Sequence, residues 1–229
     1  MRWNNTLLPA RGRILLLASV VAMSLLPGAA QAAGGSLTVN GDLAIWQMIR
    51  ASGLIAYLLL SVSVFMGIAV SVRALDWFTR RAWVLEGHQT LSTLAFAFTA
   101  FHVFMLLFNS HVPFGLAEIL VPFSANWRPI PSALGTVALY LVALLVVTSY
   151  VQPSMPRKLW RTIHYGGFAA WVLAAGHGLF AGSDTGSVWV QYMYLLTVLP
   201  VAILIVFRVL TAGGRKTSPE PSNTLSSAR

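Results

Sequence analysis

Four histidines lie inside apolar segments of the chain, and their spacing divides them into two pairs. His102 follows His88 at the spacing i, i+14, and His177 follows His164 at the spacing i, i+13. An ionisable side chain inside a membrane is costly and usually marks a functional site. Neutral imidazole binds haem iron well, and two imidazoles fill both axial positions of the iron. The pattern therefore predicts two bis-histidine haems at two depths, which together would form a path for electrons.

Each histidine taken alone has a simpler interpretation. A single histidine in a membrane helix often forms a hydrogen bond between helices or belongs to a proton path. The two depth-matched pairs favour haem over that interpretation. His111 differs from the four, because it follows the second apolar segment within Asn109–Pro113 and is interpreted as a solvated interfacial residue. Met66 and Met105 are interpreted as packing residues rather than axial ligands.

The composition places these histidines in an integral membrane protein. Of the 229 residues, 57% are hydrophobic and only 9% are charged, whereas a soluble domain has about 25% charged residues. The chain has no cysteine, which excludes disulfides, cysteine-held iron–sulfur clusters and covalently attached c-type haem. Any haem must therefore be held non-covalently, as haem b is.

The net charge of +9 follows the membrane topology and does not indicate nucleic-acid binding. Of the basic residues, only Arg50 and Arg128 fall in segments predicted to lie outside. The others gather at the N-terminus, in two loops predicted to lie inside and near the C-terminus: Arg2, Arg11, Arg13, Arg73, Arg80, Arg81, Arg157, Lys158, Arg161, Arg208, Arg215, Lys216 and Arg229. This alternation is the positive-inside pattern of a multi-pass protein with a cytoplasmic C-terminus.

Residues 1–32 have the features of a signal peptide. A basic region ends at Arg13, an apolar run covers Ile14–Leu26, and Ala30–Ala32 supplies a small-residue cleavage pattern. The apolar run is shorter than the ~20 residues that a spanning helix needs. The alternative is that this segment is retained as a first transmembrane helix.

Five longer apolar segments follow, each with about the length that a bilayer demands. They lie near residues 47–72, 87–109, 133–151, 162–181 and 188–210. The predicted fold is an all-α integral membrane bundle of five transmembrane helices after a signal peptide, or six if the first segment is retained. Residues 213–229 are rich in Ser, Pro and Thr and are predicted to be a disordered cytoplasmic tail.

The alternation of the segments makes the second and fourth spans parallel. His88 and His164 should then lie near the inner face, and His102 and His177 near the outer face. At 1.5 Å per residue the depth separations are about 21 and 19.5 Å, so the pairs match in depth.

The angular positions of the histidines match less well than their depths. At 100° per residue, the spacing i, i+14 returns to within about 40° of the starting face, whereas i, i+13 ends about 140° away. The second pair therefore requires a bend in its helix or a relative rotation of the two haems. Four glycines make local distortion feasible: Gly166, Gly167, Gly176 and Gly178.

Basic residues near the membrane faces are candidate partners of the haem propionates. Arg50 and Arg128 are the candidates for the outer haem. Arg161, with Arg80 and Arg81, is the candidate for the inner haem. The alternative, which is favoured for Arg80 and Arg81, is that the inner arginines only set the topology.

Residues 45–212 resemble the ferric reductase-like transmembrane domain family, which includes NADPH-oxidase and ferric-reductase membrane cores and the haem subunit of the bacterial methionine-sulfoxide reductase system. The resemblance rests on these segments: Arg50–Gly53, the His88 and His102 spacing, Trp160–His164 followed by His177, Val112–Phe114, and His177–Asp184. It implies that His88 pairs with His164 and His102 with His177, and that the unequal spacing is a family feature. It also implies a place in the bacterial inner membrane and six helices, which favours a retained first segment.

The chain departs from complete reductases of that family, because the short segment after Ala212 cannot form a flavin and nicotinamide domain. Electrons are therefore expected from a separate flavoprotein or quinol and are expected to pass to ferric iron or a periplasmic redox protein outside. A bound flavin has no motif in this sequence and stays open, as does the question of whether this chain or a partner performs the catalytic step. The alternatives are a small permease with a histidine proton or metal-ion relay, and a scaffold within a larger complex.

Overall fold

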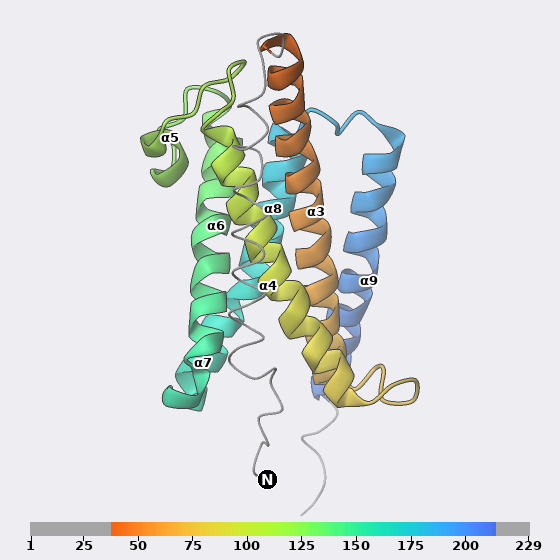
Figure 1. Cartoon of the computed structure of the whole chain (residues 1–229). Coiled ribbons are helices and arrows are strands. Elements are labelled where there is room, and N and C mark those ends of the chain that lie inside the picture. Colours follow the sequence, from red (N-terminus) through yellow and green to blue (C-terminus); the bar gives the residue numbers. More distant parts are fainter. Residues whose placement is uncertain (1–37, 214–229) are drawn as a thin grey trace, which may run out of the picture.

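The computed structural model describes residues 38–213, and within this range the chain forms α-helices and no strands (Figure 1). The all-α membrane fold predicted from the sequence is confirmed. The predicted signal peptide or first helix (1–32) lies outside the described residues, and so does the predicted tail apart from Gly213, the last residue of a helix.

Four of the five predicted spans are long uninterrupted helices. They are α3 (Thr38–Val72), α4 (Arg81–Leu106), α6 (Pro129–Tyr150) and α9 (Val188–Gly213). Each contains an apolar stretch long enough to cross a bilayer. At 35 residues α3 is about 52 Å long, so it extends beyond the ~30 Å hydrocarbon core.

The remaining predicted span is divided into α7 (Arg157–His164) and α8 (Gly166–Ala181) by a short interruption at Tyr165. The 16 residues of α8 rise only about 24 Å, so α8 needs α7 to reach the thickness of a bilayer. Short helices lie in two connections, α5 (Leu116–Leu120) and the 3-10 turn η1 (Gln152–Ser154).

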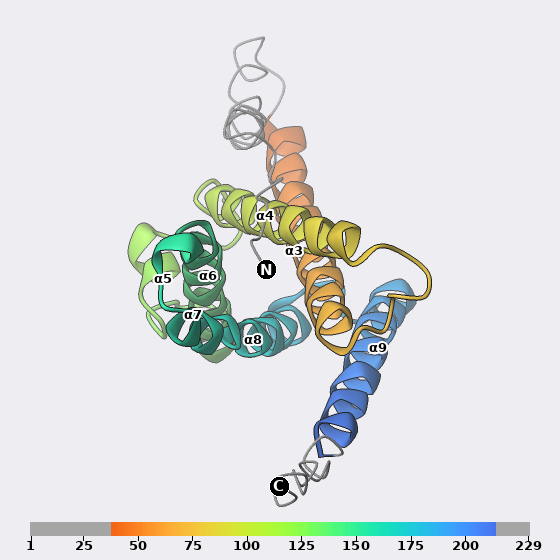
Figure 2. The same ribbon diagram turned by 90° about the horizontal axis from the view of Figure 1, so that it is seen from below.

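Four of these helices form a ring. Packing contacts join α3 to α4, α4 to α6, α6 to α8, and α8 back to α3. In the view along the bundle, α4 and α8 lie on opposite sides of this ring (Figure 2). Helix α9 packs against α3 from outside the ring. The histidine-bearing helices thus face each other, and they run in the same direction, as predicted (Figure 1).

The distribution of side chains is that of a protein in lipid. Buried polar residues such as Ser52, Ser61 and Thr148 are small, and each hydroxyl donates to the carbonyl one turn earlier in its own helix. Large apolar side chains are exposed along the helices, among them Val62, Tyr140, Val172, Leu196 and Ile203. Small residues let membrane helices approach closely, and the apolar exterior matches lipid tails.

The basic residues of the described part are unevenly distributed between the two ends of the bundle. Apart from Arg50 and Arg128, they lie in or beside the 73–80 and 151–156 connections or near the end of α9. These elements meet at the lower end in Figure 1, which also carries α7. The arrangement agrees with the charge asymmetry on which the predicted topology rests.

Candidate functional site

The four histidines meet as two facing pairs inside the ring. The ring centroids of His88 and His164 are 5.9 Å apart, and those of His102 and His177 are 6.3 Å apart. The imidazole planes are nearly perpendicular in both pairs, at 78° and 77°. Each pair joins one ring from α4 to one from the α7–α8 segment, so the structure brings together the same partners that the depth argument matched.

The spacing within each pair suits one metal ion between two imidazoles. A bond from a metal to an imidazole nitrogen is about 2 Å long. Since the ring centre lies about 1.1 Å beyond that nitrogen, two opposed ligands place their centroids about 6.2 Å apart. Among the described residues no group of three or more His, Cys, Asp or Glu side chains could hold a metal ion. Each pair could therefore supply two imidazole ligands to a metal ion.

Three of the four rings are oriented by backbone carbonyls. The Nδ1 atom lies 2.9 Å from the Ile49 carbonyl oxygen in His102, 2.8 Å from that of Pro131 in His177, and 2.8 Å from that of Ser63 in His88. A carbonyl oxygen only accepts hydrogen bonds, so Nδ1 must carry the proton. Nε2 is then left unprotonated and free to bind a metal, which is the usual arrangement for metal-binding histidines.

A glycine one helical turn after each of these carbonyls makes room for the ring. A Cβ atom at Gly53 would lie 3.1 Å from Nδ1 of His102, and one at Gly67 would lie 3.1 Å from Cε1 of His88. At Gly135 the distance to Nδ1 of His177 would be only 2.7 Å. Helix α3 thus contains two carbonyl–glycine units, and the spacing between them equals the spacing of His88 and His102 on α4.

These carbonyl–glycine units were not predicted. The glycine spacing in α3 was a readable signal, because Gly53 and Gly67 are separated in sequence by the same interval as the histidine pair of α4. The unit at Pro131 and Gly135 in α6 has no second unit at a matching spacing, so it could be recognised only from the structure.

His164 is held differently from the other three. Its Nδ1 atom is buried and has no hydrogen-bond partner among residues 38–213. Its ring stacks on Trp160, with centroids 4.7 Å apart and planes 23° apart, and the indole Nε1 is likewise buried without a partner. An aromatic neighbour one helical turn away, rather than a carbonyl, therefore orients this ring.

The interruption at Tyr165 bears on the angular mismatch expected for the second pair. It comes directly after His164, and the Phe168 amide donates to the Tyr165 carbonyl at 3.2 Å, which is the short spacing of a 3-10 turn. Such a turn winds by about 120° per residue instead of 100°, so each residue in it adds about 20°. This tighter winding reduces the offset between His164 and His177, which is the local distortion that the sequence required.

Polar side chains add a second contact at His88. Ser63 is buried, and its hydroxyl lies 3.0 Å from Nδ1 of His88 and 2.6 Å from the hydroxyl of Ser92. The Ser92 hydroxyl in turn donates to the His88 carbonyl at 2.7 Å. His88 is therefore fixed to α3 through both the carbonyl and the side chain of one residue.

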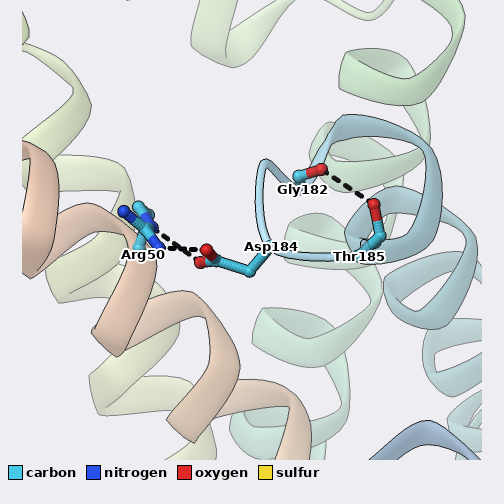
Figure 3. Close-up of polar contacts among 4 residues, drawn as sticks. All are labelled: Arg50, Gly182, Asp184 and Thr185. Atoms are coloured by element: carbon cyan, nitrogen blue, oxygen red, sulfur yellow. Dashed lines mark hydrogen bonds and ion pairs between the residues drawn. The ribbon is translucent and has the colours of Figure 1, made fainter. Parts of the chain in front are cut away.

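Two of the predicted arginines contact protein groups near His177. Arg50 donates from Nε to Oδ2 of Asp184 at 2.6 Å and from Nη2 to Oδ1 of the same carboxylate (Figure 3). Arg128 donates from Nη1 to the Phe180 carbonyl at 2.5 Å.

The other predicted arginines lie at the opposite end of the bundle. Arg161 is exposed on α7, one turn before Tyr165. Arg80 is the N-cap of α4, and Arg81 is its first residue. His111 belongs to neither pair, and its ring packs edge-on against Trp46.

Comparison with protein-family models identifies a family for this chain. The model of the family described as ferric reductase like transmembrane component matches residues 52–175, more than half of the chain. The match includes His88, His102 and His164, and it ends just before His177. No curated protein matches the chain.

Proposed function

The chain belongs to the ferric reductase like transmembrane component family, and on that premise we propose that it carries electrons across a membrane through two b-type haems. His88 and His164 hold one haem, and His102 and His177 hold the other. The observation that supports this proposal is the pairing of four imidazoles at 5.9 and 6.3 Å, on helices that face each other across the ring.

The residues around each pair favour electron transfer over chemistry on a bound substrate. Haem supplies one-electron oxidation and reduction when it is bound. Haem held by two histidines would have no coordination position open for oxygen or another ligand. The carbonyls of Ile49, Ser63 and Pro131 hold three of the four imidazoles in the tautomer that binds iron.

The orientation of the path follows from the charge asymmetry. The end of the bundle rich in Arg and Lys is the inner one under the positive-inside rule, so His88 and His164 lie toward the cytoplasm. In this arrangement the C-terminus is cytoplasmic and the membrane is the bacterial inner membrane. Arg161, exposed at the same end, pairs with the acid groups of the inner haem.

Partners supply and remove the electrons in this proposal. A separate flavoprotein or quinol donates at the inner haem. Ferric iron or a periplasmic redox protein accepts at the outer haem. The catalytic step then belongs either to this chain at its outer face or to the partner.

Haem stoichiometry tests the proposal. Protein purified from haem-replete cells is assayed by pyridine haemochrome, together with the single variants His88→Ala, His102→Ala, His164→Ala and His177→Ala. We expect two haems per chain in the wild type and one in each variant. His111→Ala is the matched control and keeps both haems, because His111 is in neither pair.

A wild-type protein without haem would refute the proposal, as would four variants that all keep two haems. A permease that uses the histidines as an ion relay gives the first of these results and loses ion flux in the variants.

A further inference from the structure

Two arginines at the His102–His177 end contact the same short piece of chain. Arg50 comes from α3 and Arg128 from the start of α6, yet both reach the end of α8 and the loop directly after it, close to His177 in sequence. The sequence predicted both as partners of haem acid groups. Their contacts in the structure favour a different role.

The Arg50 contact has a two-point geometry. Its Nε and Nη2 donate to the two oxygens of the Asp184 carboxylate, the fork arrangement that fixes direction as well as distance (Figure 3). The loop that presents Asp184 is itself ordered, since the Ser187 amide donates to the Asp184 carbonyl at 2.8 Å and the Thr185 hydroxyl to the Gly182 carbonyl at 3.2 Å. Arg50 is therefore tied to a defined position in that loop.

The Arg128 contact is made to the end of a helix. Helix α8 ends at Ala181, so the carbonyl of Phe180 is one of the last-turn carbonyls without a partner inside the helix. A guanidinium there satisfies that carbonyl and is favoured by the negative end of the helix dipole. Arg128 itself caps α6 in the left-handed conformation, with φ of 45°, and its guanidinium also lies over the Trp127 ring.

Both arginines adjoin the carbonyls that orient the two histidines. Arg50 directly follows Ile49, whose carbonyl accepts from His102. Arg128 lies one turn before Pro131, whose carbonyl accepts from His177. The two contacts thus connect the carbonyls behind both rings to the segment that carries His177.

The opposite end is linked by contacts of another kind. Arg208 of α9 donates to the Ser71 hydroxyl of α3 at 2.5 Å and to the Tyr165 hydroxyl at 3.3 Å, so it meets neither a carboxylate nor the end of a helix. The ion pair of Arg73 with Asp76 at that end is local to one turn. We infer that Arg50 and Arg128 are positioning residues that brace α8 against α3 and α6 and so fix the distance between His102 and His177. They act through Asp184 and the Phe180 carbonyl, not by binding an acid group of the haem.

The inference rests on the proposed function, and the test separates the two. The single variants Arg50→Gln and Asp184→Asn, the double variant, and Arg128→Gln are compared with the wild type, all as haem-loaded protein. The first readout is the rate of haem transfer to apomyoglobin. The second is the electron paramagnetic resonance signal of the outer ferric haem, which responds to the angle between its imidazole planes, 77° in this structure.

We expect each single variant to lose the outer haem roughly two- to five-fold faster, the range for one partly exposed ion pair or one hydrogen bond. The outer signal shifts in all of them, the inner signal does not, and the double variant is no worse than either of its parents. Asp76→Asn is the matched control, since it breaks an ion pair at the other end, and it leaves both signals unchanged.

A wild-type rate and signal in Asp184→Asn, together with haem loss in Arg50→Gln, would overturn the inference and make Arg50 a direct haem partner. A double variant whose acceleration is the product of the two single effects would overturn it as well. Absence of haem from the wild type would instead refute the proposed function.

Discussion

Replacing Gly135 by alanine should remove the outer haem, even though alanine favours a helix. A Cβ atom at this position would lie 2.7 Å from Nδ1, 2.8 Å from Cε1 and 3.0 Å from Cγ of His177. Ordinary contacts begin at 3.4 Å, so the ring must move by about 0.7 Å. All three atoms belong to the ring of His177. Since Gly135 is held within the backbone of α6, the ring is the part that must shift.

The balance of energies runs against the substitution. Alanine gains about 1 kcal/mol of helix propensity over glycine. The displaced ring loses its hydrogen bond to the Pro131 carbonyl, which leaves buried polar groups unsatisfied at a cost of about 1–3 kcal/mol. A metal–nitrogen bond is about 2 Å long, so a ring displaced by about 0.7 Å no longer places its nitrogen at bonding distance. We therefore expect His177 to lose its bond to the iron as well.

Haem stoichiometry and the spectrum of the remaining haem measure this effect. We expect Gly135→Ala to carry one haem, at His88 and His164, with an unchanged inner signal. Gly41→Ala in α3 serves as the control, because a Cβ there meets no heavy atom of the described residues within 4 Å, and it should keep both haems. Two haems with wild-type spectra in Gly135→Ala would show that the carbonyl–glycine unit does not hold His177.

Two further predictions concern buried hydroxyls of α3. Ser63→Ala removes the hydroxyl contact to His88 but keeps the carbonyl contact, so both haems should remain. The protein should lose about 1 kcal/mol of stability, and the midpoint potential of the inner haem should shift. An unchanged potential in a redox titration would contradict this prediction. Trp171→Phe removes the indole donor to the hydroxyl of Ser61 at 2.9 Å. The loss of this hydrogen bond should lower the thermal midpoint by the equivalent of about 1 kcal/mol without changing the haem content. Thermal unfolding followed by haem absorbance measures the midpoint, and loss of a haem would contradict the prediction.

Much of the fold could be predicted from the sequence, because membrane insertion depends on local composition. The apolar lengths located the four long helices of the described range and the divided α7–α8 segment. The alternation of charge indicated which helices run in the same direction. The parallel course of α4 and α8 then followed, and with it the depth match of His88 with His164 and of His102 with His177. These are properties of residues close together in sequence.

The parts that could not be predicted depend on contacts between distant residues. Arg50 and Asp184 are 134 positions apart, and nothing in the local sequence of either indicates the other. The placement of α9 outside the ring is likewise a matter of packing, since its composition resembles that of the ring helices. The interruption at Tyr165 was anticipated only as a requirement for distortion somewhere between His164 and His177.

The carbonyl–glycine units have a consequence for how mutational surveys of this protein should be read. The atom of Ile49 and of Pro131 that fixes the tautomer belongs to the main chain, and every side-chain replacement keeps it. Alanine scanning therefore leaves the carbonyl in place at both positions, and a loss at the buried Ile49 will report its missing side chain rather than its contact with His102. The positions most sensitive to substitution will instead be Gly53 and Gly135, one helical turn further on, although neither carries a functional group.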